Sequence, residues 1–104
     1  MALTRSFKDT IQTRAINDVA FRCGLLTEAL DCFLAGELEE GKSILRDYIN
    51  ATIGFEELAK LTEKTPKSLM RMLSASGNPN AQNLFLIIHH LQEREGVRLS
   101  VTTS

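Results

Sequence analysis

The sequence predicts an all-α protein, a bundle of about five to six helices followed by one short strand. Apolar residues recur at three- and four-residue spacing through most of the chain, and capping side chains or glycines separate the successive runs. A length of 104 residues allows one compact core, and 43 % hydrophobic with 24 % charged residues is an ordinary globular composition. We therefore interpret residues 1–104 as one domain with a helical segment at 1–54, a second helical unit at 55–96 and a tail at 97–104.

Residues 1–54 are expected to form an N-terminal helical extension. Ser6 is placed to cap a first short helix, and Asn17 is placed to cap the next. Gly36 closes that second helix, and a third helix with the same apolar periodicity stops at Gly54. The connection between the second and third helices is short, which predicts antiparallel neighbours in a bundle. The residues expected to line the core from the second helix are Phe21, Leu25, Leu26, Ala29, Leu30, Phe33 and Leu34.

The unit at 55–96 begins with two short helices separated by a tight turn. The first helix runs from Phe55 to about Thr62. Thr65 then caps the second helix, and Pro66 stands at its first position, where the missing N–H costs nothing and the fixed φ is already helical. Short helices joined in this way are typical of a helix-turn-helix. The apolar residues of the first helix are Phe55, Leu58, Ala59 and Leu61, and those of the second are Leu69, Met72 and Leu73.

A long helix and a short strand complete the predicted secondary structure. Asn80 caps the helix after a turn at Asn78-Pro79, and Gly96 ends it. In residues 97–101, apolar and polar side chains alternate as in a half-buried strand. Because a lone strand needs a partner, we expect a second copy of the chain to supply it.

The net charge of −1 hides an uneven distribution of charges along the chain. Between residues 60 and 73, four cations accompany one carboxylate, whereas between residues 28 and 40 five carboxylates stand without a cation. The protein is therefore expected to have one basic surface, suited to an acidic partner, and one acidic surface, suited to a basic partner. The cations are Lys60, Lys64, Lys67 and Arg71, and the carboxylates are Glu28, Asp31, Glu37, Glu39 and Glu40.

The second short helix has the chemistry of a DNA recognition helix. Arg71 can donate two hydrogen bonds to guanine O6 and N7, Lys67 can donate one, and Ser68 can bond to a base or a phosphate. Lys60 and Lys64 are expected to contact phosphates, which position the protein without specifying sequence. The alternative is a solvated helix face, but the helix-turn-helix context favours DNA. The expected DNA-binding residues are Lys60, Lys64, Thr65, Pro66, Lys67, Ser68, Arg71, Asn78 and Asn80.

Residues 55–96 resemble the lambda-repressor-like, Xre-type family of helix-turn-helix proteins in the Leu-Ala pair at 58–59, the Thr65 cap and the Asn-Pro turn at 78–79. The whole chain, from LTRSFKDTIQTR at 3–14 onward, is similar to antidote proteins of HigA type in bacterial toxin–antitoxin modules. This resemblance implies a five-helix fold, a homodimer on a palindromic operator and repression of its own promoter. It also implies a small toxin of the RelE, ParE or HigB kind as a protein partner.

The acidic stretch is the expected toxin-binding surface. Glu37, Glu39 and Glu40 would complement a basic toxin, since toxins that cut RNA or attack gyrase tend to be basic. The alternative for this stretch is a solvated loop. A stand-alone repressor without a toxin would carry the same residues and stays open, as does a protein-interaction adaptor that keeps the fold without binding DNA. The basic face favours a DNA reader over an adaptor.

Catalysis, a metal and a membrane span are not expected. Adjacent His89 and His90 point about 100° apart on a helix and make a poor joint metal site. Cys23 and Cys32 fall on opposite faces of one helix and are interpreted as reduced, apolar side chains. The sequence contains no recognisable set of nucleophile, base and orienting group and no phosphate-binding glycine loop. With no apolar run near the ~20 residues of a membrane helix, we expect a cytoplasmic protein without a cofactor.

Overall fold

The computed structural model describes residues 17–104, and all regular secondary structure in this part of the chain is helical. These residues form the five helices α2 (Val19–Leu34), α3 (Leu38–Ala51), α4 (Phe55–Thr62), α5 (Pro66–Met72) and α6 (Ala81–Glu95). The all-α prediction is therefore confirmed for the described residues, whereas the short helix predicted after Ser6 lies outside them. None of the described helices combines the length and the apolar character needed to cross a membrane.

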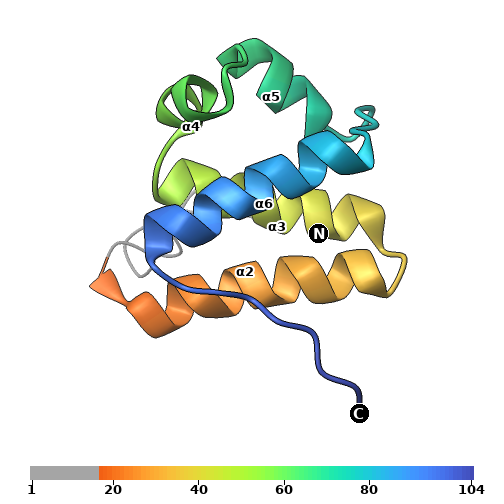
Figure 1. The fold of residues 1–104 in the computed structure, drawn as a ribbon. Coiled ribbons are helices and arrows are strands. Elements are labelled where there is room, and N and C mark those ends of the chain that lie inside the picture. The colour runs from red at the N-terminus through yellow and green to blue at the C-terminus, as the bar shows by residue number, and fades with distance from the viewer. Residues whose placement is uncertain (1–16) are drawn as a thin grey trace, which may run out of the picture.

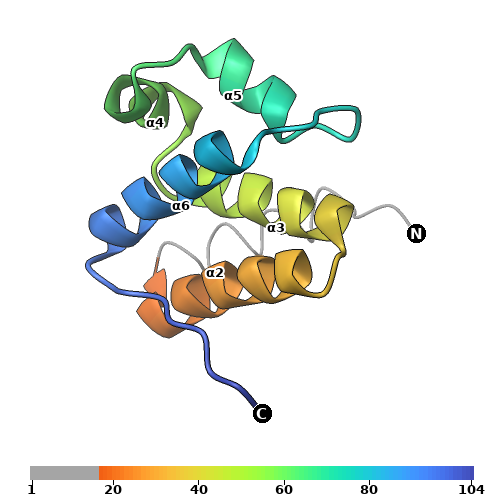
Figure 2. The same cartoon turned by 45° about the vertical axis from the view of Figure 1, so that its right-hand side comes forward.

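The helices surround one hydrophobic core. Helices α2 and α3 run antiparallel side by side, as their short connection predicted, and α6 crosses next to α3 (Figures 1 and 2). The short α4 and α5 lie together on the other side of α6, at the edge of the molecule (Figure 1). Every described helix contributes to this core. Its buried residues are Leu26, Ala29, Leu45, Tyr48, Ile49, Phe55, Leu58, Ala59, Leu69, Leu73, Ile87, Ile88 and Leu91.

Local capping chemistry sets the helix ends. At the start of α6 the Asn80 Oδ1 accepts the N–H of Asn83 at 2.8 Å, and Gly96 ends the helix in the left-handed conformation (φ 74°), both as predicted. The prediction for α2 is wrong by one residue: Asp18, not Asn17, is the cap, and its carboxylate accepts a backbone N–H three residues on at 3.0 Å. Asn and Asp are equally good caps, so their adjacency hid the true boundary.

The buried face of α4 also differs by one residue from the prediction. Leu61 is 42 % exposed, whereas Thr62 is 7 % exposed and its hydroxyl donates to the Leu58 carbonyl at 2.8 Å. The helical period places position 62 in line with 55, 58 and 59, and position 61 beside them. A threonine can take such a buried position because its hydroxyl finds a carbonyl one turn back in its own helix.

The predicted C-terminal strand is wrong. Residues 97–104 adopt neither helix nor strand and instead pass across α2 (Figure 1). The Leu99 N–H donates to the Gln92 side-chain oxygen at 2.7 Å, and the Leu99 side chain packs against the core. Val97 and Leu99 are half-buried while Arg98 and Ser100 are exposed, which accounts for the alternation over 97–100 but not for Val101, which is 67 % exposed. The tail thus packs against the helices of its own chain, whereas the predicted strand was expected to pair with a second copy.

A polar network joins α2, α3 and α6 at the end of α6. The Glu95 carboxylate accepts hydrogen bonds from Arg22 Nε at 2.9 Å and from Arg22 Nη2 at 3.0 Å. It also accepts one from the Tyr48 hydroxyl at 2.6 Å, and its side chain is only 8 % exposed. These contacts tie the N-terminal pair of helices to the last helix.

Candidate nucleic-acid interface

Helices α4 and α5 are joined by a turn of three residues, 63–65, that contains no glycine. Glu63 takes the left-handed conformation (φ 57°), and among the described residues it is the one non-glycine residue that does so. The N–H groups of Glu63 and Lys64 return to the carbonyls of Lys60 and Ala59, at 3.4 and 3.0 Å. These bonds satisfy carbonyl groups that the end of α4 would leave without partners, so the exit of the chain from α4 is set by its backbone.

The start of α5 is capped as predicted. Thr65 Oγ1 accepts the N–H of Ser68 at 3.1 Å, and Pro66 occupies the first turn of the helix. The Thr65 backbone is extended (φ −93°, ψ 149°), so the helix begins at a defined residue. A helix of seven residues makes only about two turns and is unstable alone. The direction of α5 therefore depends on what its side chains and its ends contact.

The two faces of α5 differ sharply in burial. Leu69 and Leu73 are fully buried at 0 % exposure in the core they share with α4 and α6. Lys67, Met70 and Arg71 are exposed, Met70 to 46 %. The helix thus presents two cations and one apolar side chain to solvent, while two leucines on the opposite side attach it to the core.

The nine residues predicted to contact DNA all retain exposed surface. Three of them are half-buried: Lys64, Pro66 and Ser68. Asn80 is exposed, but its side-chain oxygen is engaged in capping α6, so only its NH₂ group is available to donate to a ligand. The helices that carry the cations, α4 and α5, are neighbours at the edge of the molecule (Figure 1). The exposed members of the set are Lys60, Thr65, Lys67, Arg71, Asn78 and Asn80.

The predicted acidic surface lies where α2 gives way to α3. Glu37, Glu39 and Glu40 are all exposed, and Glu39 forms an ion pair of 2.8 Å with Lys42. Donor atoms of Cys32, Glu37 and Glu40 lie within 4.8 Å of one another. Partial burial, and then the charges of Glu37 and Glu40, raise the pKa of the Cys32 thiol. These three side chains therefore form one acidic cluster at the corner between α2 and α3.

Two residues of α3 were missed by sequence reasoning although they contact the region next to α5. Lys42 is 1 % exposed and donates to the carbonyls of Ser74 and Gly77 at 2.9 and 2.7 Å. Arg46, which is half-buried, donates to the Leu73 carbonyl. A signal was present in the sequence, since Lys42 falls on the same helical stripe as the core residues at 45 and 49.

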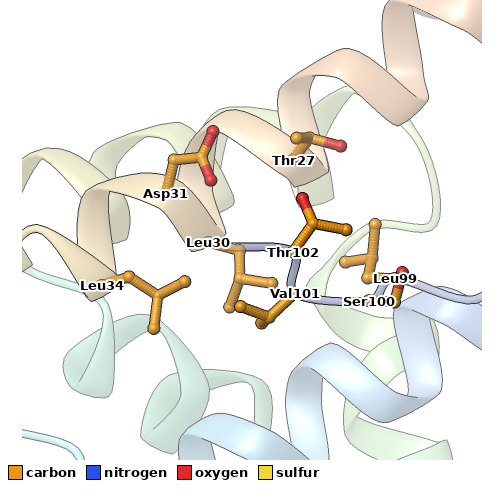
Figure 3. Close-up of a pocket in the computed structure, with 8 residues that line it drawn as sticks. All are labelled: Thr27, Leu30, Asp31, Leu34, Leu99, Ser100, Val101 and Thr102. Atoms are coloured by element: carbon orange, nitrogen blue, oxygen red, sulfur yellow. The ribbon is translucent and has the colours of Figure 1, made fainter. Parts of the chain in front are cut away.

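A hollow of about 250 Å³, lined by polar and apolar side chains, lies between α2 and the tail. Leu30 and Leu34 of α2 face it together with Val101 of the tail (Figure 3). Leu34 and Val101 are 63 % and 67 % exposed, so the hollow is a shallow surface feature. It lies on α2, away from the cations of α4 and α5. The residues that line it are Thr27, Leu30, Asp31, Leu34, Leu99, Ser100, Val101 and Thr102.

No protein-family model, no curated protein and no solved structure matches this chain. What the described residues define is a helical bundle with a short, capped, basic helix at its edge and an acidic surface at the corner between α2 and α3. Function is therefore inferred from the geometry and chemistry of these two surfaces.

Proposed function

We propose that the protein is a sequence-specific DNA-binding transcriptional regulator in which α4 and α5 form a helix-turn-helix of the lambda-repressor-like, Xre type. The observation that carries the proposal is the division of α5 and its C-terminal cap into a buried side, with Leu69 and the cap residue Leu73, and an exposed side, with Lys67 and Arg71. Such a helix is anchored to its bundle on one side and offers hydrogen-bond donors on the other.

The dimensions of α5 suit the major groove of B-form DNA. A helix with its side chains is about 10–12 Å in diameter, and the groove is about 12 Å wide. Arg71 then donates to guanine O6 and N7, while Lys67 donates one hydrogen bond to a base. The exposed Met70 supplies an apolar contact of the kind that a thymine methyl group accepts. In this proposal, these three side chains contact the bases and so determine which DNA sequence is bound.

Phosphate contacts come from the elements on either side of α5. Lys60 near the end of α4 and Lys64 in the turn supply positive charge. Asn78 and the NH₂ group of Asn80 lie on the loop before α6 and donate to phosphate oxygens. These contacts fix the position of the protein on the duplex without specifying sequence.

A regulator with one recognition helix per chain covers one half of a palindromic site, so the proposed active form is a homodimer, acting in the cytoplasm at the nucleoid. The exposed acidic surface at Glu37, Glu39 and Glu40 supports the further proposal of an antitoxin that represses its own promoter and binds a small basic toxin of the RelE, ParE or HigB kind. Replacing Glu37 and Glu40 by lysine is then expected to weaken toxin binding and to leave DNA binding intact. Glu39 is left unchanged in this variant because its carboxylate is paired with Lys42.

The test is binding of the purified chain to labelled DNA from upstream of its own coding region, compared with a scrambled fragment at two salt concentrations. Arg71→Ala is expected to abolish the preference for the upstream fragment. Arg98→Ala is the matched control, because it removes another exposed arginine, which lies in the tail. A wild-type chain without preference for either fragment contradicts the proposal and directs attention to a protein-interaction adaptor.

A further inference from the structure

The geometry points to Lys42 as a positioning residue for DNA recognition: its ammonium group binds the loop between α5 and α6 at two points, Ser74 and Gly77, and Arg46 is a second anchor. This role rests on the proposed function, since the two segments joined by the loop are the ones assigned to base and phosphate contacts. Neither Lys42 nor Arg46 is itself placed on the DNA.

Three oxygens surround the Lys42 ammonium group. Nζ lies 2.9 Å from the Ser74 carbonyl, 2.7 Å from the Gly77 carbonyl and 2.8 Å from a carboxylate oxygen of Glu39. An ammonium group has three N–H donors, so each has an acceptor. Among the described residues no buried side-chain nitrogen or oxygen lacks a partner, and Lys42 obeys that rule at 1 % exposure.

The two carbonyl groups lie at the start of the loop and just before its Asn78-Pro79-Asn80 segment. Ser74 follows Leu73, the residue that ends α5, and Gly77 immediately precedes Asn78. Carbonyl groups at the end of a helix lack partners within the helix and carry its negative pole, which a cation stabilises. Arg46 binds the adjacent Leu73 carbonyl, so two cations of α3 hold the terminus of α5.

The loop itself is folded tightly against α5. The Gly77 N–H donates to the Ser74 carbonyl at 3.0 Å, and a Cβ atom added at Gly77 would lie 2.0 Å from the Arg71 carbonyl. The loop therefore runs directly beneath the backbone of a proposed base-reading residue. A displacement of the loop would move Arg71 relative to Asn78.

The buried Lys42 fixes the conformation of the loop rather than adding much to the stability of the fold. Removing its charge from water costs free energy that a methionine of similar length would not incur. In return, Nζ must lie where its three acceptors converge, and this condition restricts the loop to one arrangement. A short α5, which cannot hold its own orientation, depends on that restriction.

The test compares Lys42→Met with Tyr48→Phe in the full chain. Both variants remove one hydrogen-bonding group from α3, but Tyr48 contacts Glu95 at the opposite end of α6. Circular dichroism identifies a temperature at which all variants are folded, and affinities for the upstream and scrambled DNA fragments are measured there. Lys42→Met is expected to reduce the ratio of upstream to scrambled affinity about tenfold, the usual effect of losing one base contact. Tyr48→Phe is expected to leave this ratio unchanged.

Arg46→Ala carries the test if Lys42→Met does not fold, because Arg46 is half-buried and has a single carbonyl partner at this site. A folded Lys42→Met with the wild-type ratio overturns the inference, as does an unfolded Lys42→Met accompanied by an unchanged ratio in Arg46→Ala. Both results leave the proposed function standing. A wild-type chain with no preference for its upstream DNA removes the proposed function and this inference together, so the two failures are distinguishable.

Discussion

The Tyr48 hydroxyl donates a 2.6 Å hydrogen bond to the Glu95 carboxylate, the same group that Arg22 contacts through two nitrogen atoms. Tyr48 belongs to α3 and Glu95 to the last turn of α6. Burial and the hydrogen bond to Glu95 raise the pKa of Tyr48, so the phenol is protonated and donates this bond at neutral pH. The pair therefore couples the N-terminal helices to the helix that supports α4.

Tyr48→Phe removes the donor and leaves Glu95 with Arg22 as its partner. Because hydrogen bonds to charged groups contribute about 1.5–3 kcal/mol, we expect the free energy of unfolding to fall by about that amount. Urea denaturation followed by circular dichroism measures the change. An unaltered midpoint of the transition would show that the Tyr48 hydroxyl contributes nothing to stability.

Glu95 is expected to make the protein sensitive to acid. Its hydrogen bonds with Arg22, in the first place, hold the pKa of the carboxyl below its ordinary value. A carboxyl with a lowered folded pKa contributes stability that is present above the unfolded value of about 4.3 and is lost as the pH falls through the folded value. We expect Glu95→Gln to be less stable than wild type at neutral pH, and the difference to shrink as the pH falls below about 4.3. A difference that stays constant down to acidic pH would exclude this role for Glu95.

Lys60→Ala is expected to weaken DNA binding without changing its specificity. A lysine that contacts phosphate supplies affinity to every sequence equally, so upstream and scrambled fragments should lose the same factor. The slope of the logarithm of affinity against the logarithm of salt concentration should fall by about 1. Arg71→Ala in the same experiment should instead lower the preference for the upstream fragment. A Lys60→Ala variant that loses preference would mean that α4 takes part in base reading.

Gly77→Ala is expected to destabilise the protein by about 1–3 kcal/mol, the usual cost of forcing atoms into a filled space. The added Cβ would lie 2.0 Å from the Arg71 carbonyl and 2.7 Å from that of Met72, and these backbone atoms cannot turn aside. Gly24→Ala is the matched control, because Gly24 lies within α2 and, among the described residues, no atom outside the local helix backbone lies within 4 Å of a new Cβ. That variant should be about 0.5–1 kcal/mol more stable than wild type. Equal melting temperatures for the two variants would show that the space around Gly77 is not filled.

The boundaries of the described helices followed closely from the sequence. Thr65, Pro66, Asn80 and Gly96 begin or end helices where predicted, because caps act through hydrogen bonds and dihedral angles within three or four residues. Where two neighbours compete for one role, as Asn17 and Asp18 do, local chemistry does not separate them. The exposed cations of α5 were predictable for the same reason, since helical periodicity assigns Lys67 and Arg71 to the face opposite Leu69.

Only the tertiary structure decided which distant residues meet. Lys42 is read from the sequence as one more charged residue in an amphipathic helix, and its partners Ser74 and Gly77 stand 32 and 35 residues away. The tail was assigned to a strand by its alternation, but the packing of Leu99 on its own bundle satisfies the same pattern. The sequence by itself determined the helices, their caps and the exposed cations of α5, through interactions that span one or two turns. The position of α5 in the bundle was decided by packing between segments that only the folded chain brings together. The contacts of Lys42 and Arg46 with the loop after α5 were decided in the same way, by hydrogen bonds between distant segments.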